Sequence, residues 1–343
     1  MITVRIKKII QETFNTKSFV LETQDGTPLP YKAGQFLTFV FKHITGEEVR
    51  RSYSLSSSPA LNEPATITVK RIDNGEYSRK LIDAAKVGDT LQTIGASGFF
   101  TLPPETNAYK QIIFIAAGSG ISPIYSLIKT VLHTQPDMHI GLLYSNTKQG
   151  TTIFYKELNK LQQQFSERFK IEFLFSTSAD LLRARLSFGL LEILLKEYAI
   201  DSLKNILFYV CGPYDYMRMI SIKLQSEGVQ QENIKREIFN IEAPKKRPQP
   251  SDKEPHIVTI QLGEETYKFP VRYPTTILQA AKKLNIPIPY SCESGQCGTC
   301  AGTCVKGKVW MWHNDVLLDD EIERGRVLTC TGYPVNGDVT VKY

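Results

Sequence analysis

The 343-residue sequence lacks any apolar run of about 18 residues, the length that a membrane-spanning helix needs. It also lacks a charged N-terminal stub followed by an apolar core, because lysines interrupt a strand-like pattern from Met1 to Gln11. Neither a membrane protein nor a secreted one is therefore expected. The default expectation is a cytoplasmic location.

A strong charge of one sign is missing as well. The formal net charge of +6 is spread over a long chain. The one dense basic run, Lys245 to Arg247, lies among prolines and is best interpreted as part of a solvated linker. Nucleic-acid binding is not expected. No internal repeat or low-complexity tract is evident.

Cysteine is scarce outside one segment. Five of the six cysteines fall in the last 52 positions, and only Cys211 lies elsewhere. A disulfide framework suits small secreted chains, and this chain has neither property. The clustering favours a local metal or cluster site.

The chain is longer than one hydrophobic core usually serves, and it changes in character along its length. The first hundred residues show short strands and turns, which predict an antiparallel β-barrel or sandwich. From Gln111, short apolar runs alternate with helical stretches, as in a parallel α/β sheet. A segment with four prolines then precedes a predicted hairpin and helix. We place the domains at 1–104, 105–242 and 256–343, with a linker at 243–255.

The clustered cysteines have a known spacing. Cys292, Cys297 and Cys300 form C-x4-C-x2-C, and Cys330 follows after 29 intervening residues. This pattern matches the plant-type [2Fe-2S] arrangement. Gly295 allows the tight turn that three thiolates on one loop require, and Gly298 does the same.

Zinc is the alternative occupant, because four cysteines also suit a tetrahedral site. Structural zinc sites usually use two short-spaced pairs, so iron-sulfur is favoured. Cys304 is expected to be a free buried thiol in a strand. The segment Ile257 to Tyr343 resembles plant-type ferredoxins, which implies a β-grasp fold with Cys292, Cys297, Cys300 and Cys330 as cluster ligands.

Two further motifs resemble the flavin-binding motifs of the ferredoxin-NADP reductase family. They are Arg51-Ser52-Tyr53-Ser54-Leu55 and Gly75-Glu76-Tyr77-Ser78. The resemblance implies an FAD-binding barrel, with the guanidinium of Arg51 on the pyrophosphate. It gives Tyr53 an aromatic contact with the flavin and Ser54 a catalytic hydroxyl near flavin N5. Without the resemblance, an ordinary half-buried strand would explain Tyr53 and Ser54.

The second flavin motif adds a helix. We expect Ser78 to open a helix over Ser78 to Ala85, whose N-terminal amides favour phosphate. Its glycine, Gly75, precedes the helix. Residues Val69 and Lys70 of the intervening strand complete the implied flavin-binding set.

The segment Gly118-Ser119-Gly120-Ile121-Ser122-Pro123 departs from the dinucleotide fingerprint G-x-G-x-x-G, because proline is in the last position. The same reductase family carries G-x-G-x-x-P here and Cys-Gly-Pro after a later strand, which is Cys211-Gly212-Pro213. The resemblance implies nicotinamide-nucleotide contacts from Gly118, Gly120, Ser122, Pro123, Gly212 and Pro213. It makes Cys211 a catalytic residue near the nicotinamide, although composition alone favours an inert core cysteine. Phe239 is implied to flank the flavin.

The order of segments resembles the reductase components of oxygenases, including those of phenylacetyl-CoA degradation. The resemblance implies electron flow from NAD(P)H through FAD and a [2Fe-2S] cluster to a protein acceptor, an oxygenase component. NADPH is favoured over NADH, because Ser176 is followed by threonine and not by a carboxylate, with Arg183 and Arg185 nearby. The alternatives are a general ferredoxin-type reductase without a dedicated oxygenase, and a non-catalytic redox sensor or zinc-bearing binding module.

Overall fold

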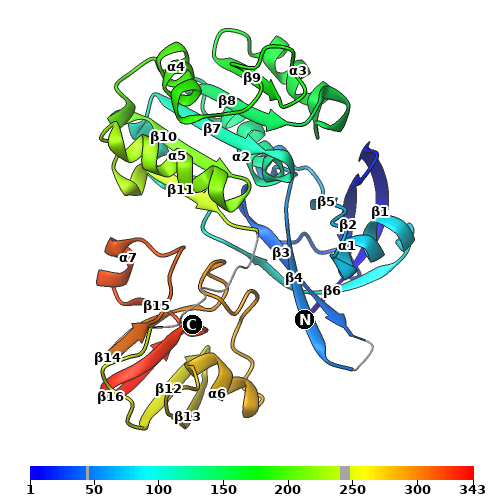
Figure 1. The fold of residues 1–343 in the computed structure, drawn as a ribbon. Helices are drawn as coiled ribbons and strands as arrows, with labels where there is room; N and C mark the ends of the chain where they lie inside the picture. The colour runs from blue at the N-terminus through cyan, green and yellow to red at the C-terminus, as the bar shows by residue number, and fades with distance from the viewer. Residues whose placement is uncertain (44–45, 240–247) are drawn as a thin grey trace. The chain divides into compact units, whose positions relative to one another are not determined.

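The computed structural model describes residues 1–43, 46–239 and 248–343. The chain divides into two compact units, Met1–Asn240 and Ile241–Tyr343 (Figure 1). Residues 243–247 of the predicted linker, including the basic run from Lys245 to Arg247, lie outside the described residues. The limits of the three domains remain predictions.

The N-terminal part of the first unit is a six-stranded antiparallel sheet in the order β4-β3-β6-β1-β2-β5. Its strands are β1 (Ile2–Thr13), β2 (Thr16–Thr23), β3 (Phe36–Lys42), β4 (Glu48–Ser54), β5 (Thr66–Lys70) and β6 (Thr90–Ser97). The two end strands meet through a bridge between Leu55 and Ile67, so the sheet closes around one apolar core. The predicted antiparallel barrel is confirmed. Helix α1 (Glu76–Arg79) and a π-helical turn (Lys80–Ala84) follow β5.

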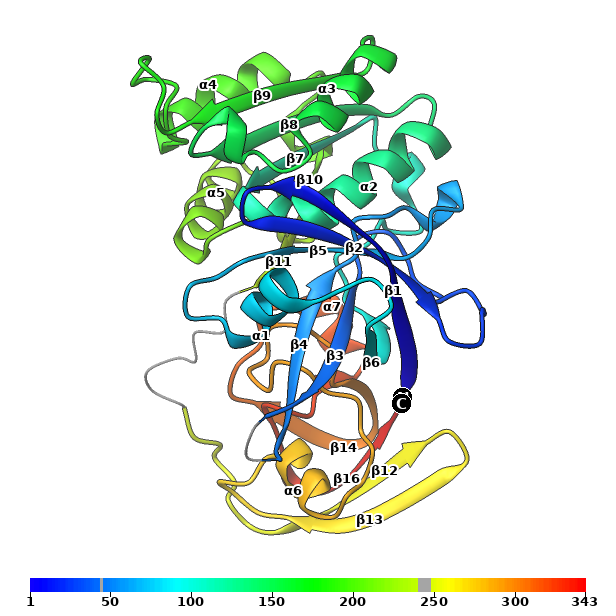
Figure 2. The same cartoon turned by 90° about the vertical axis from the view of Figure 1, so that its right-hand side faces the viewer.

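The rest of the first unit is a parallel sheet in the order β11-β10-β7-β8-β9. Its strands are β7 (Gln111–Ala117), β8 (His139–Asn146), β9 (Phe169–Phe175), β10 (Leu207–Cys211) and β11 (Ile234–Glu237). Its helices are α2 (Ile121–Thr134), α3 (Tyr155–Gln164), α4 (Phe188–Tyr198) and α5 (Tyr214–Ser226). Helices α2 and α3 pack on one face, and α4 and α5 on the other (Figure 2). Burial on both faces explains the continuous apolar runs, and the α/β prediction is confirmed.

The second unit has a mixed sheet in the order β13-β12-β16-β14-β15. Its elements are β12 (His256–Leu262), β13 (Glu265–Val271), α6 (Ile277–Lys283), β14 (Ala301–Met311), α7 (Asp319–Glu323), β15 (Arg326–Leu328) and β16 (Gly332–Lys342). The central pair β12 and β16 is parallel, and the other pairs are antiparallel. Thr276 and Gln279 cap helix α6 reciprocally, which fixes its start. This is the β-grasp arrangement that the resemblance implies.

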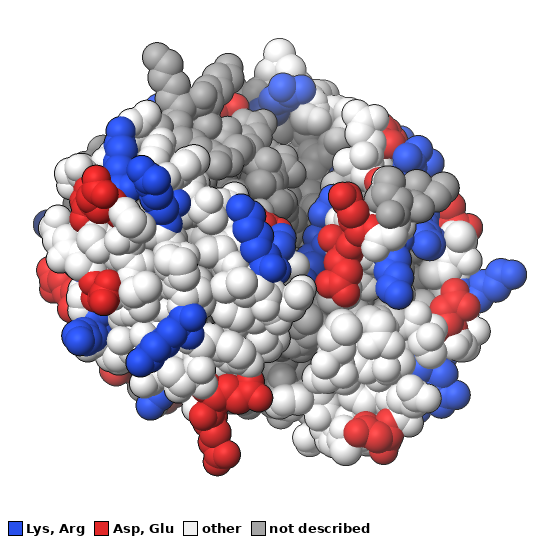
Figure 3. All heavy atoms as spheres, turned by 90° about the horizontal axis from the view of Figure 1, so that it is seen from below, with Lys and Arg blue, Asp and Glu red and all other residues white. Residues whose placement is uncertain are grey.

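Charged side chains are spread over the surface. On the face shown in Figure 3, lysine and arginine alternate with aspartate and glutamate. A helix long and apolar enough to cross a membrane does not occur in the part of the chain that the structure describes.

Candidate functional site

Two of the predicted motifs abut at the carboxyl edge of the parallel sheet. Strand β7 runs into Gly118-Ser119-Gly120, and its neighbour β10 runs into Gly212-Pro213. A Cβ atom on Gly120 would lie 2.1 Å from the carbonyl oxygen of Cys211. Only glycine fits there, so the two turns can touch because of this residue. Ligands of open α/β sheets bind at this edge.

A cavity of about 450 Å³ opens beside these turns. Its lining contains the predicted residues Lys70, Gly118, Gly120, Gly212, Pro213 and Phe239. It also contains residues that the sequence did not indicate, namely Phe14, Asn15, Ala117, Ser119, Ser145, Asn146, Thr147 and Thr151. The barrel and the α/β sheet therefore both contribute walls to one site.

Lys70 supplies a cation to this cavity. It is the last residue of β5, and its Nζ lies 3.7 Å from where a Cβ of Gly118 would be. Backbone amides at a glycine turn together with an ammonium group suit a phosphate. The arrangement fits the pyrophosphate of a nicotinamide nucleotide.

Two tyrosines support the end of β7 and its glycine turn, of which Tyr144 is buried and Tyr216 is half-buried. Tyr144 donates its hydroxyl proton to the carbonyl oxygen of Gly118 at 2.9 Å, and Tyr216 donates to that of Ala116 at 3.1 Å. Burial raises the pKa of both hydroxyls, so they remain protonated donors. The sequence carried no signal for either residue, because both contacts join distant segments.

Cys211 is fully buried, and burial raises the pKa of its thiol well above the usual value. An inert core cysteine would have the same surroundings, so its catalytic role stays a prediction. Ser122 and Pro123 lie in the first turn of α2, a position that suits proline. The Ser122 hydroxyl is buried and lacks a hydrogen-bond partner within the described structure. Such a group costs free energy unless a ligand satisfies it.

The first flavin motif lies along β4. Arg51 is exposed, donates from Nη1 to the Arg50 carbonyl oxygen at 2.7 Å, and lies 5.4 Å from the ring centroid of Tyr77. Tyr53 is half-buried, and burial raises its pKa, while Ser54 ends the strand and is buried. The Tyr77 hydroxyl is buried without a partner in the described part of the chain. An exposed guanidinium beside an unsatisfied hydroxyl fits an anionic cofactor such as FAD.

In the second flavin motif, the helix begins at a different residue from the one predicted. Helix α1 begins at Glu76 with Gly75 as its N-cap, so the predicted start at Ser78 is wrong by two residues. The Ser78 hydroxyl instead closes the preceding turn: it accepts from Ile72 N at 3.2 Å and donates to Gly75 O at 3.0 Å. Val69 lies in the barrel core with 1% exposure, which leaves only its backbone for ligand contact.

The remaining nucleotide candidates lie at strand ends. Ser176 follows β9, is half-buried, and donates its backbone N–H to Asn146 O at 3.0 Å. Phe239 follows β11 and is 42% exposed, with its ring available to a ligand in the cavity. Sequence motifs alone gave no indication that Phe14, on the β1–β2 turn and 78% exposed, lines the same cavity.

The four predicted cluster ligands lie together in the second unit. The Cys292 thiol pairs with those of Cys297 and Cys330, and Cys330 also pairs with Cys300. These contacts hold the pKa of Cys292 well below its usual range and raise those of Cys297 and Cys330. The four thiols thus form one connected group, in which Cys292 and Cys330 are the inner members and Cys297 and Cys300 the outer ones. A [2Fe-2S] cluster of the plant type is held by four cysteine thiolates.

The loop that carries these thiols is tightly packed. Gly295 has a φ of +79°, and a Cβ there would lie 2.6 Å from the His313 carbonyl oxygen. The amide of Ser294 donates to Cys292 Sγ at 3.5 Å. Amide contacts of this kind stabilise the negative charge of a reduced cluster.

The sequence left two points open for this segment: whether zinc could occupy the four-cysteine site, and whether Cys304 is a free buried thiol. Across residues 1–43, 46–239 and 248–343, three or more His, Cys, Asp or Glu side chains are nowhere arranged to hold a single metal ion. Cys304 lies in β14 as a free cysteine, as predicted, but it is half-buried, so the predicted burial of its thiol is wrong. The register of β14 against β16 shifts next to Cys304, and its Sγ lies 3.3 Å from Lys306 O.

Three family models match the chain in the predicted order. Residues 3–102 match an oxidoreductase FAD-binding domain, residues 114–221 an oxidoreductase NAD-binding domain, and residues 260–335 a 2Fe-2S iron-sulfur cluster binding domain. These matches support iron-sulfur over zinc at the four cysteines. They also indicate FAD and a nicotinamide nucleotide as the other cofactors.

Curated relatives are similar over almost the whole chain. One subunit of the 1,2-phenylacetyl-CoA epoxidase of Escherichia coli is 31% identical, with 91% of this chain and 88% of the relative covered. The ferredoxin reductase component of 3-ketosteroid-9-alpha-monooxygenase from Rhodococcus rhodochrous is 29% identical, with 98% and 95% covered. A solved phthalate dioxygenase reductase shares the fold, with 24% identity, a TM-score of 0.60, and 99% and 97% of the two chains covered.

Proposed function

The chain belongs to the ferredoxin-NADP reductase family, in the group with a C-terminal plant-type [2Fe-2S] domain, and from this we propose that it supplies electrons from NADPH to an oxygenase component in the cytoplasm. It is an NAD(P)H-dependent oxidoreductase that uses FAD and a [2Fe-2S] cluster. The observation that carries the proposal is the group of four cluster thiols in the same chain as a cavity lined by the Gly118 and Gly212 turns, Lys70 and Phe239. The proposed acceptor is a component such as that of phenylacetyl-CoA degradation, because a 1,2-phenylacetyl-CoA epoxidase chain is among the relatives.

The residues of this chain would bind and position the cofactors. The bound cofactors supply the redox chemistry, in which FAD accepts a hydride and the cluster accepts one electron at a time. Lys70 and the Gly118 turn would hold the nucleotide phosphates, and Arg51 would hold the FAD pyrophosphate. Tyr53 and Phe239 would cover the flavin ring. The Ser54 hydroxyl, at the buried end of β4, would donate a hydrogen bond to the flavin near the atom that receives the hydride.

Anaerobic reduction followed in the visible spectrum tests this function. The purified protein should show flavin bands and a broad iron-sulfur absorbance, and NADPH should bleach both. A colourless protein that contains zinc would contradict the proposal and favour a binding module. A coloured protein that reduces many ferredoxins equally well would favour a general reductase without a dedicated oxygenase.

The nucleotide preference gives a first prediction. Arg183, one of the two arginines near Ser176, donates to Glu172 and Glu197 at 2.9 Å each, so its charge is already paired. Arg185 is exposed and is the better partner for a 2′-phosphate. We predict that wild type prefers NADPH. Arg185→Ala should lower kcat/KM for NADPH about fivefold, the effect of losing roughly 1 kcal/mol, without changing it for NADH. A wild-type preference for NADH would overturn this.

An acidic strip near the C-terminus gives a second prediction. From Asp315 to Glu323 the sequence has five carboxylates and no lysine or arginine. Three of them are already engaged: Asp315 with His313, Asp320 with Arg324, and Glu321 with the α7 cap. The free acidic surface is therefore Asp319 and Glu323, which is smaller than the sequence indicated.

We expect these two carboxylates to steer the second unit onto a basic acceptor. Reversing them together, Asp319→Lys with Glu323→Lys, should slow electron transfer to the oxygenase several-fold at low ionic strength and flatten its salt dependence. Flavin reduction by NADPH should not change. Glu264→Lys with Glu265→Lys, an exposed double reversal at the β12–β13 turn, is the control matched in charge. If the test variant and the control slowed electron transfer equally, net charge alone would explain the effect. If the test variant left the transfer rate unchanged, the acidic strip would have no role in steering.

A further inference from the structure

A polar interface joins helix α2 to the loop that follows β4, and the cofactor motifs do not account for it. Three residues of α2 lie on one face at i, i+3 and i+4 spacing. Three residues of the loop face them. We call the set the α2 seam: Ser57, Ser58 and Glu63 on the loop, and Ser126, Lys129 and Thr130 on the helix.

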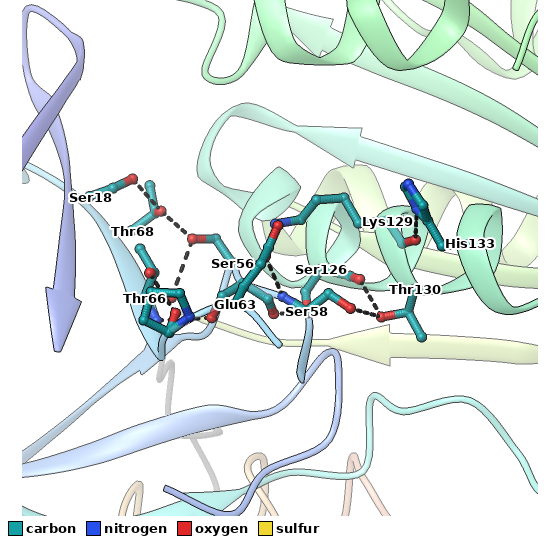
Figure 4. Close-up of polar contacts among 12 residues, drawn as sticks. Ser18, Ser56, Ser58, Glu63, Thr66, Thr68, Ser126, Lys129, Thr130 and His133 are labelled. Atoms are coloured by element: carbon teal, nitrogen blue, oxygen red, sulfur yellow. Dashed lines mark hydrogen bonds and ion pairs between the residues drawn. The ribbon is translucent and has the colours of Figure 1, made fainter. Parts of the chain in front are cut away.

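Two hydroxyl contacts form one part of the seam (Figure 4). Ser126 Oγ donates to the carbonyl oxygen of Ser57 at 2.5 Å. Ser58 Oγ and Thr130 Oγ1 lie 2.7 Å apart. Ser58 and Ser126 are both 0% exposed, so water does not compete for these bonds. Hydrogen bonds between buried hydroxyls are directional and fix the distance between the two backbones.

An ion pair forms the other part. Lys129 Nζ pairs with Glu63 Oε2, and the same oxygen accepts the backbone N–H of Ser58 at 2.7 Å. The Lys129 side chain is 10% exposed and lies over the ring of Tyr125 at 4.5 Å. Burial lowers the pKa of Lys129, and the contact with Glu63 opposes this. The Glu63 side chain is 32% exposed, so only one partner of the pair is buried. Such a pair adds little stability over an apolar replacement, but it specifies one geometry.

The loop is itself fixed to the barrel. Ser56 Oγ lies 2.7 Å from Thr68 Oγ1, which lies 2.8 Å from Ser18 Oγ on β2 (Figure 4). Tyr31 bonds to Ser57 Oγ at 2.7 Å. The seam therefore connects α2 to three separate parts of the barrel, and not to a loose loop.

The seam lies close in sequence to both cofactor motifs. Ser57 is three residues beyond Ser54 of the flavin motif, and Ser126 is six residues beyond Gly120 of the nucleotide turn. At about 1.5 Å per helical residue, Ser126 is roughly 9 Å along α2 from that turn. Movement at the seam would thus displace the nucleotide turn relative to β4.

We infer that the α2 seam sets the position of the nicotinamide relative to the flavin, and that Ser126, Lys129 and Glu63 are positioning residues for hydride transfer. The inference rests on the proposed function. Hydride transfer needs the reacting atoms about 3–3.5 Å apart, and a displacement of about 1 Å can cost up to 100-fold in rate. A seam of fixed geometry between the two binding halves supplies that constraint.

The test is the double variant Lys129→Met with Glu63→Gln, which removes the pair without leaving a lone buried charge. In anaerobic stopped-flow at saturating NADPH, we expect flavin reduction in the FAD-loaded protein to slow about tenfold. The charge-transfer absorbance between oxidised nucleotide and reduced flavin should weaken, while the Kd for NADP⁺ and the FAD content stay unchanged. The single variant Lys129→Arg, which keeps the ion pair with Glu63, should retain most of the wild-type rate of flavin reduction.

The matched control is Arg5→Met with Glu22→Gln, an exposed ion pair on the same barrel. It should leave the rate and the absorbance unchanged. A double variant that lowers only the melting temperature would overturn the inference and make the seam merely structural. If that variant fails to hold FAD, Ser126→Ala decides, with a rate loss in support and an unchanged rate against. A wild-type protein that NADPH does not reduce at all would instead contradict the proposed function.

Discussion

A Cys330→Ser protein is expected to lose the iron-sulfur absorbance and nearly all one-electron delivery, while NADPH still reduces its flavin at the wild-type rate. The Cys330 thiol is 5% exposed and contacts those of Cys292 and Cys300. A serine hydroxyl is a poor iron ligand because iron in such clusters prefers thiolate. Since losing even an outer-shell contact weakens a metal site about 10- to 100-fold, losing a ligand should leave little cluster.

Cys304→Ser is the control for this result. Cys304 lies on β14, and its Sγ contacts the carbonyl oxygens of Lys306 and Gly307. Its replacement should leave the cluster spectrum and cytochrome c reduction unchanged. The comparison is made on iron and sulfide content and on absorbance. If Cys304→Ser lost the cluster and Cys330→Ser kept it, the ligand assignment would be wrong.

The sequence was most informative where the function depends on a short segment. The C-x4-C-x2-C loop and the two glycine turns are local, and the structure brings each predicted group together. The barrel and the α/β sheet were also predictable in their order, because each has its own apolar period, whereas the β-grasp fold came from the resemblance to plant-type ferredoxins. The assignment of Tyr53 and Ser54 as flavin contacts came from resemblance to a family and not from composition, and it stays a prediction.

The sequence was uninformative where distant segments meet. Phe14 and Asn15 line the nucleotide cavity from the β1–β2 turn, and Tyr144 reaches Gly118 from β8. Neither fact has a sequence signal, since both depend on how the strands are arranged. The start of α1 at Glu76 was missed because Gly75 could be either a turn residue or an N-cap. The half-burial of Cys304 follows from an irregular register that alternation alone does not predict.

A chain that ends at Ala243 should fold, bind FAD and reduce ferricyanide with NADPH. The first compact unit, Met1–Asn240, contains its own apolar cores in the barrel and on both faces of the parallel sheet. It also contains every flavin and nucleotide residue proposed above, from Arg51 to Phe239. Its own hydrogen bonds, including those of the α2 seam, join the barrel to α2. Folding therefore does not depend on the second unit.

The same truncated chain should lose almost all delivery to cytochrome c and to the oxygenase, because the four cluster thiols are gone. Ferricyanide serves as the internal control, since it can take electrons from the flavin directly. The two rates, measured on one preparation with known FAD content, separate loss of folding from loss of the electron path. A truncated chain that supplied the oxygenase at the full rate would place the cluster off that path, and the Cys330→Ser result would then have to come from a docking defect. Agreement between the two variants, with ferricyanide reduction intact in both, is the result that assigns the cluster as the exit for electrons.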